Sequence, residues 1–136
     1  MQFLINNWYL FLTLAVIAYF LLAGPIMQAA RGIKTLPVAQ AVRFMNQESA
    51  LVLDVREPDE FRSGHIPNAV NIPLGALPGR LKEIEKYKDK AILLNCRTSQ
   101  RSARAALMLR KQGYTTAHIL GGGILAWQKE NLPTEK

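Results

Sequence analysis

The chain has 136 residues, a formal net charge of +7 and a single cysteine. This length allows one compact domain and little more, and one cysteine excludes an internal disulfide. All 17 Lys and Arg and all 10 Asp and Glu lie after residue 30, so the chain divides into an uncharged segment, residues 1–30, and a charged domain, residues 31–136. Nucleic acid is not expected as a partner, because the basic residues are interspersed with acidic ones and form no basic–aromatic stripe.

Residues 8–27 form an apolar stretch of the length that a membrane-spanning helix needs. A helix rises about 1.5 Å per residue, so roughly 20 residues cross a hydrocarbon core of about 30 Å. A cleaved signal peptide fits less well, because no basic residue precedes the stretch and the following residues are a poor cleavage site. A buried core helix would not be apolar on every face in so small a protein. We therefore expect an uncleaved transmembrane anchor within residues 1–30, in contact with the lipid bilayer through residues 8–27.

The charges that flank this stretch predict its orientation. No basic side chain precedes it, whereas Arg31 and Lys34 follow it. Because basic residues stay on the cytoplasmic side of a membrane, we expect a single-pass arrangement with the charged domain in the cytoplasm. A lone cysteine agrees with a reducing compartment.

The charged domain alternates strands with helices along the chain. Residues 37–46 carry apolar side chains three and four positions apart, which is typical of an amphipathic helix, and Gly113 is a good stop for a later one. The predicted strands are continuous apolar runs, which favours an α/β fold whose parallel sheet is covered by helices on both faces. After a short first strand near residue 35, we expect strands at residues 50–55, 69–72, 91–95 and 116–120, and helices at 37–46, 57–61, 80–87, 102–112 and after 121–123.

Cys96 directly follows the predicted strand 91–95 and begins the loop 96–101 (CRTSQR), after which a helix starts near Ser102. Ligands of open parallel sheets bind outside the carboxyl ends of the strands. A short loop that leads into a helix can point several unpaired backbone N–H groups at one centre, which makes an anion site and favours the thiolate form of a cysteine. Arg97 and Arg101 add positive charge. The loop therefore indicates a reactive Cys96, with a buried and inert cysteine as the alternative.

Four segments in order resemble the rhodanese domain: residues 51–61 (LVLDVREPDEF), 64–73 (GHIPNAVNIP), 96–102 (CRTSQRS) and 120–127 (LGGGILAW). The resemblance extends over residues 35–133. It implies a rhodanese-like three-layer α/β/α sandwich with a five-stranded parallel sheet of order 1-5-4-2-3, here preceded by one transmembrane helix. Single-domain rhodaneses of bacteria with such an anchor are a known arrangement, so we expect the inner (cell) membrane of a bacterium as the location.

The resemblance also implies a sulfurtransferase. Cys96 is then the catalytic residue, which takes sulfane sulfur from an anionic donor such as thiosulfate, carries it as a persulfide and passes it to a thiol or cyanide acceptor. The loop residues Arg97, Thr98, Ser99, Gln100 and Arg101 are expected to bind the substrate. Asp54 and Arg56 are expected to support the loop rather than to react. No cofactor and no metal is expected, because two distant histidines and one cysteine do not make a zinc site.

Two other functions compete with this hypothesis. Cell-cycle phosphatases of the same fold have five residues between the cysteine and the arginine of the loop, whereas four separate Cys96 from Arg101, and the tighter ring favours sulfur transfer. A membrane-tethered binding module that docks a partner without turnover is the alternative from a different class, and a membrane protein is a possible partner of either. Many members of the family carry glycine where this chain has Ser99, which leaves the preferred donor open.

Three further residues are interpreted as structural. His65 is expected to fix a turn through a hydrogen bond, and His118 to pack at the last strand. Trp127 is expected to anchor the core.

Overall fold

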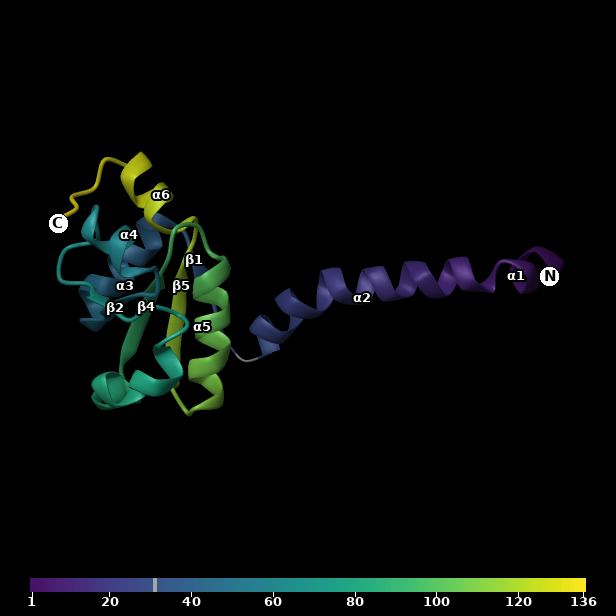
Figure 1. The fold of residues 1–136 in the computed structure, drawn as a ribbon, viewed down its shortest axis with the longest axis horizontal. Helices are drawn as coiled ribbons and strands as arrows, with labels where there is room; N and C mark the ends of the chain where they lie inside the picture. The colour runs from purple at the N-terminus through teal and green to yellow at the C-terminus, as the bar shows by residue number, and fades with distance from the viewer. Residues whose placement is uncertain (31) are drawn as a thin grey trace. The chain divides into compact units, whose positions relative to one another are not determined.

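The structure is a computed structural model that describes the backbone of residues 1–30 and 32–136, and the side chains of residues 1–23 and 32–136. Its internal contacts divide the chain into two units, Met1–Gly32 and Ile33–Lys136. Figure 1 shows both units as ribbons.

The first unit consists of helix α1 (Gln2–Asn6) and helix α2 (Trp8–Ala30), which has 23 residues. Across the described residues, no helix combines the length and the apolarity that crossing a membrane requires. The transmembrane helix predicted over residues 8–27 therefore gains no support from this finding. That prediction extends to residues 24–27, whose side chains lie outside the described ones, and Arg31, used to predict the orientation, also lies outside the described residues.

The second unit contains five strands and five helical segments. All strand pairs are parallel, and the sheet has the order β1-β5-β4-β2-β3, which confirms the predicted parallel sheet and its strand order. In chain order, the elements are β1 (Thr35–Leu36), α3 (Val38–Glu48), β2 (Leu51–Asp54), α4 (Pro58–Arg62), β3 (Val70–Asn71), η1 (Leu77–Tyr87), β4 (Ala91–Asn95), α5 (Gln100–Lys111), β5 (Thr116–Leu120) and α6 (Gly123–Lys129).

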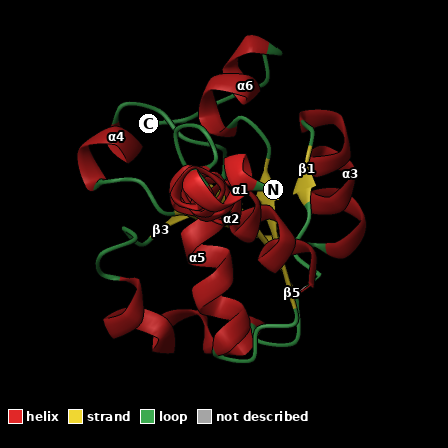
Figure 2. Cartoon of the chain, turned by 90° about the vertical axis from the view of Figure 1, so that its right-hand side faces the viewer, coloured by secondary structure: helices red, strands yellow, loops and turns green. Residues whose placement is uncertain are grey.

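Two apolar cores cover the two faces of the sheet. Residues of α5 and η1 pack on one face, in a cluster that includes Leu94 and Cys96. Residues of α3 and α6 pack on the other face, in a cluster that includes Leu93 and Trp127. Figure 1 shows α3 and α5 on opposite sides of the strands, and Figure 2 shows β1 and β3 at opposite edges of the sheet. The central strands β2 and β4 are buried along their whole length, which explains their continuous apolar sequences.

One predicted helix differs in type. The segment expected as a helix over residues 80–87 belongs to η1, which is a 3-10 helix that begins earlier and contains a non-helical residue, Arg80. Proline near its start and few buried side chains (Leu77 and Ile84) fit the weaker hydrogen-bond geometry of this helix type.

Candidate active site

Cys96 lies one residue beyond β4, at the carboxyl end of a central strand, as predicted from the sequence. Its side chain belongs to the apolar cluster beneath α5 and is 1% exposed. The loop that follows ends at Ser99, which is the N-cap of α5. Arg97, Thr98 and Gln100 are exposed, and Arg101 is partly buried.

The backbone of this loop offers a run of hydrogen-bond donors. From Arg97 to Ser102, no N–H group donates to any acceptor that the structure describes, and the first donor to do so is Ala103, to the Ser99 carbonyl. The N-terminus of a helix leaves such groups unpaired and favours negative charge. The loop 96–101 therefore has the donors that an anionic sulfur or oxygen needs.

The start of α6 holds this loop from the side. Ile124 N–H donates to the Cys96 carbonyl at 2.8 Å, and Leu125 N–H donates to the Arg97 carbonyl at 3.3 Å. Gly123 has φ +57°, and a Cβ built there would lie 2.3 Å from the Cys96 oxygen and 2.4 Å from the Thr98 oxygen. Only glycine permits this approach, which is the physical reason for a glycine at position 123.

Ser99 takes part in the same attachment. Its φ is −150°, so this position does not need the left-handed backbone that glycine favours. Its hydroxyl oxygen accepts a hydrogen bond from Gly122 N–H at 3.0 Å. The serine therefore adds a bond between the loop and the turn instead of straining the loop.

Arg101 is held by a residue that sequence reasoning did not select, Glu60 of α4. The guanidinium donates two hydrogen bonds to the Glu60 carboxylate, at 2.7 and 2.9 Å. Hydrogen bonding from Arg101 lowers the pKa of Glu60 to about 2, and the same pair raises the pKa of Arg101. Glu60 also forms the capping box of α4 with Glu57. The Glu60–Arg101 ion pair therefore connects the start of α5 to α4.

Asp54 and Arg56 form a buried ion pair at the end of β2. Asp54 is fully buried and Arg56 is 4% exposed. The Arg56 guanidinium donates to both oxygens of the Asp54 carboxylate and also to the Gly64 carbonyl at 2.9 Å. Asn95, the residue before Cys96, donates weakly to Asp54 at 3.4 Å. This network ties the ends of β2 and β4 to the loop after α4.

A cavity of about 290 Å³ borders the loop at Arg97. Among the described residues, no acidic side chain pairs with Arg97, whereas the other basic residue of the loop, Arg101, is engaged by Glu60. The cavity is lined by Arg56, Glu60, Ser63, Gly64, Arg97, Ile124, Leu125 and Gln128. Because Arg97 lines this cavity and Arg101 is paired with Glu60, Arg97 is the basic residue of the loop that is available to a ligand.

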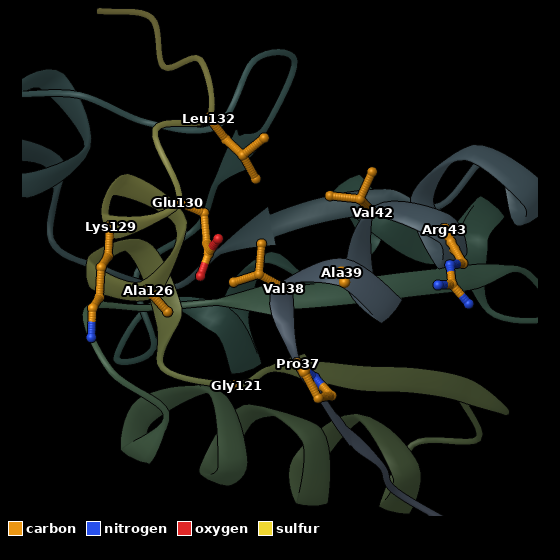
Figure 3. Close-up of a pocket in the computed structure, with 10 residues that line it drawn as sticks. All are labelled: Pro37, Val38, Ala39, Val42, Arg43, Gly121, Ala126, Lys129, Glu130 and Leu132. Carbon is orange, nitrogen blue, oxygen red and sulfur yellow. The ribbon is translucent and has the colours of Figure 1, made fainter.

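A larger cavity of about 780 Å³ lies between α3 and α6 (Figure 3). The residues that line it are mostly apolar, and none carries a nucleophilic or acid–base group beyond the ends of Arg43, Lys129 and Glu130. Cys96 and the loop residues 97–101 are not among them. This cavity is therefore separate from the candidate active site.

The residues interpreted as structural have structural contacts. His65 Nδ1 lies 2.9 Å from the Phe61 carbonyl oxygen, and its ring stacks on Phe61. His118 accepts a hydrogen bond from Lys34 N–H, and burial lowers the pKa of its imidazole. Trp127 is 4% exposed. Within the described residues, no group of three or more His, Cys, Asp or Glu is placed to hold a metal ion.

Comparisons with known proteins agree with this geometry. Residues 38–130 match the model of the rhodanese-like domain family. A sulfurtransferase of Allochromatium vinosum is 38% identical over 91 residues, which are 67% of this chain and 83% of that protein. The protein YqhL of Bacillus subtilis is 50% identical over 78 residues, 57% of this chain and 60% of its own. The crystal structure of a rhodanese-related protein from Thermoplasma volcanium superimposes with a TM-score of 0.66 at 33% identity, covering 75% of this chain and 97% of that one.

Proposed function

The chain belongs to the rhodanese-like domain family and has a sulfurtransferase-type function, and we propose that Cys96 carries the transferred sulfur as a persulfide. One observation supports this proposal above all. The only cysteine of the chain lies at the start of a loop whose successive N–H groups, from Arg97 to Ser102, have no acceptor among the described residues.

The proposed reaction has two steps. The Cys96 thiolate attacks the outer sulfur of thiosulfate, the S–S bond of the donor breaks, and sulfite leaves with the bonding electron pair. A thiolate or cyanide then attacks the outer sulfur of the persulfide, and the product leaves as a persulfide or thiocyanate while the Cys96 thiolate is restored. The enzyme-bound group is a sulfur anion both as thiolate and as persulfide, so donors that stabilise an anion are what the protein must supply.

The loop and its cavity supply those donors. The N–H groups from Arg97 to Ser102 have no acceptor among the described residues, and we expect them to stabilise the charge that develops on sulfur. Arg97 attracts the anionic donor into the neighbouring cavity of about 290 Å³. Arg101, bound to Glu60, acts on the charge at a fixed position instead of moving to meet the donor.

The activity is tested by thiocyanate formation from thiosulfate and cyanide. We expect the wild-type protein to turn over and the Cys96→Ser variant to be inactive. Arg97→Ala is expected to raise KM for thiosulfate about tenfold, the scale of one charge-assisted hydrogen bond. Arg104→Ala, which removes an exposed arginine from α5, is the matched control and should leave KM unchanged. Equal turnover by the wild type and Cys96→Ser would contradict the proposal, and a wild type that binds a partner without any turnover would favour the binding module.

The phosphatase alternative has its own readout. Release of phosphate from an aryl phosphate at a rate that depends on Cys96 would replace sulfur transfer as the favoured reaction. We expect no such release, because the loop has four residues between Cys96 and Arg101.

We further propose that residues 8–27 attach the protein to the inner membrane of a bacterium, with the second unit in the cytoplasm. No charged side chain occurs in residues 1–30, and large apolar side chains of α2 are exposed, among them Leu14 (65%) and Phe20 (75%). Such an apolar surface is typical of contact with lipid or with another protein. Sulfur would then be delivered near the membrane, and a membrane protein is a candidate acceptor.

Flotation of the full-length protein with phospholipid vesicles tests the attachment. The wild type is expected to float with the vesicles, and Leu14→Lys with Ile17→Lys to remain below. Val70→Lys makes the same kind of change at an exposed position of the second unit and serves as the control. A wild type that does not float would contradict the attachment, and an active alkaline phosphatase fused to the C-terminus would contradict the orientation.

A further inference from the structure

Ser102 carries a fully buried hydroxyl beside the Cys96 loop. Its side chain is 0% exposed, and its Oγ has no hydrogen-bond partner among the described residues. A buried hydroxyl that loses water without gaining a partner is disfavoured, and alanine would occupy this helix position without that penalty. The contribution of Ser102 to folding therefore does not explain why a hydroxyl is present at this position.

The side chain of Ser102 is on the same side of the sheet as Cys96. The buried residues of α5 are Ser102, Ala105, Ala106 and Leu109, whose spacing defines one face of the helix. Three of them belong to the apolar cluster that contains Cys96. Ser102 is the first buried residue of α5, at the end of the helix that follows the Cys96 loop.

The other buried oxygen near the loop does not share this position. Asn95 Oδ1 also has no partner among the described residues. Side chains alternate along a strand, so Asn95 faces away from Cys96, toward the face where Leu93 packs. An amide oxygen is also an acceptor, which cannot serve an anion. On the Cys96 side of the sheet, Ser102 is a buried hydroxyl donor that no partner among the described residues engages, whereas the Tyr114 hydroxyl donates to the Leu81 carbonyl.

We propose that the Ser102 hydroxyl donates a hydrogen bond to the outer sulfur of the Cys96 persulfide. This inference rests on the proposed sulfur transfer. The outer sulfur lies about 2 Å from Sγ and carries the negative charge. Ser102 keeps its proton in both steps, since the sulfur enters from thiosulfate as sulfite leaves and departs on the acceptor. Ser102 is then a catalytic residue that stabilises the loaded form.

The loading equilibrium of Cys96 between thiosulfate and sulfite tests the proposal. The fraction of full-length protein that carries the added sulfur is measured by intact mass at several sulfite concentrations. We expect the loading constant to fall about tenfold in Ser102→Ala, as for loss of a hydrogen bond to a charged acceptor. Ser102→Thr, which keeps a hydroxyl, should stay within about twofold of the wild type. Ser49→Ala removes an exposed hydroxyl at the end of α3 and should match the wild type.

Melting temperatures separate this role from a structural one. Removing an unpartnered hydroxyl is expected to leave the unloaded protein as stable as the wild type or more so, and to destabilise only the loaded form. Ser102→Gly deletes the same hydroxyl and provides a second measurement of the loading constant. Equal loading constants in the wild type and in both deletion variants would overturn the role of Ser102, whereas a wild type that never takes up sulfur would overturn the proposed function itself.

Discussion

The ion pair between Glu60 and Arg101 predicts a stability difference that depends on pH. Replacing Glu60 by Gln removes the carboxylate that Arg101 grips with two hydrogen bonds. The pKa of Glu60 falls from 4.5 to about 2, chiefly through the hydrogen bond from Arg101. A depression of this size corresponds to about 3.4 kcal/mol at most. Because the two side chains remain 33% and 31% exposed, solvent screening reduces the expected loss of unfolding free energy to about 1–2 kcal/mol at pH 7.

The sign of the pH dependence follows from the lowered pKa. A carboxylate whose pKa is lower in the folded state stabilises the protein above pH 4.5, and this contribution is lost as the pH falls toward about 2. Urea unfolding should therefore show a clear difference between the wild type and Glu60→Gln at pH 7 and a much smaller one near pH 2.5. Glu83→Gln, which breaks an exposed pair with Arg80, is the matched control and should change little. An equal cost of Glu60→Gln at both pH values would refute the reasoning.

Three further substitutions have expected outcomes. Gly123→Ala should destabilise the protein by about 3 kcal/mol and abolish sulfur transfer, since its Cβ would collide with the Cys96 loop; Gly79→Ala, with open space around it, is the thermal-unfolding control, and equal melting temperatures would contradict this contact. Ser99→Ala should lower the free energy of unfolding by about 1 kcal/mol, because it removes the hydrogen bond to the β5–α6 turn. An unchanged urea midpoint would argue against that bond. Asp54→Asn should lower the free energy of unfolding by about 3 kcal/mol, because it leaves the buried Arg56 guanidinium without its counter-charge. A decrease below about 1 kcal/mol, measured by urea unfolding, would contradict the buried pair.

The central strands β2 and β4 were predictable because their sequences carry the signal of burial on both faces. Residues 91–95 and 116–120 have the same bounds in the structure as in the prediction. The position of Cys96 between β4 and α5 was also predictable, since a cysteine directly after a buried strand and before a helix can be recognised locally. The 3-10 form of η1 was not, because the charged residues of 80–87 suit either helix type.

The contacts that fix the loop depend on tertiary structure and could not be predicted from local sequence. The partners Glu60 and Arg101 are 41 positions apart in the chain, and Ser99 bonds to a turn 23 positions later. In the structure, Glu60 takes part in a local capping box at residues 57–60, and nothing in the local sequence indicated its second, long-range contact with Arg101. Ser99 was interpreted by comparison with glycine, and only its φ of −150° shows that glycine is not needed here.

The mass of the intact protein after treatment with thiosulfate tests the central proposal most directly. The chain has one cysteine, so any thiol-bound sulfur must be on Cys96. We predict a gain of about 32 Da, the mass of one sulfur atom, that cyanide removes and that Cys96→Ser does not show. No gain in the folded wild type, or an equal gain in Cys96→Ser, would contradict a persulfide at Cys96.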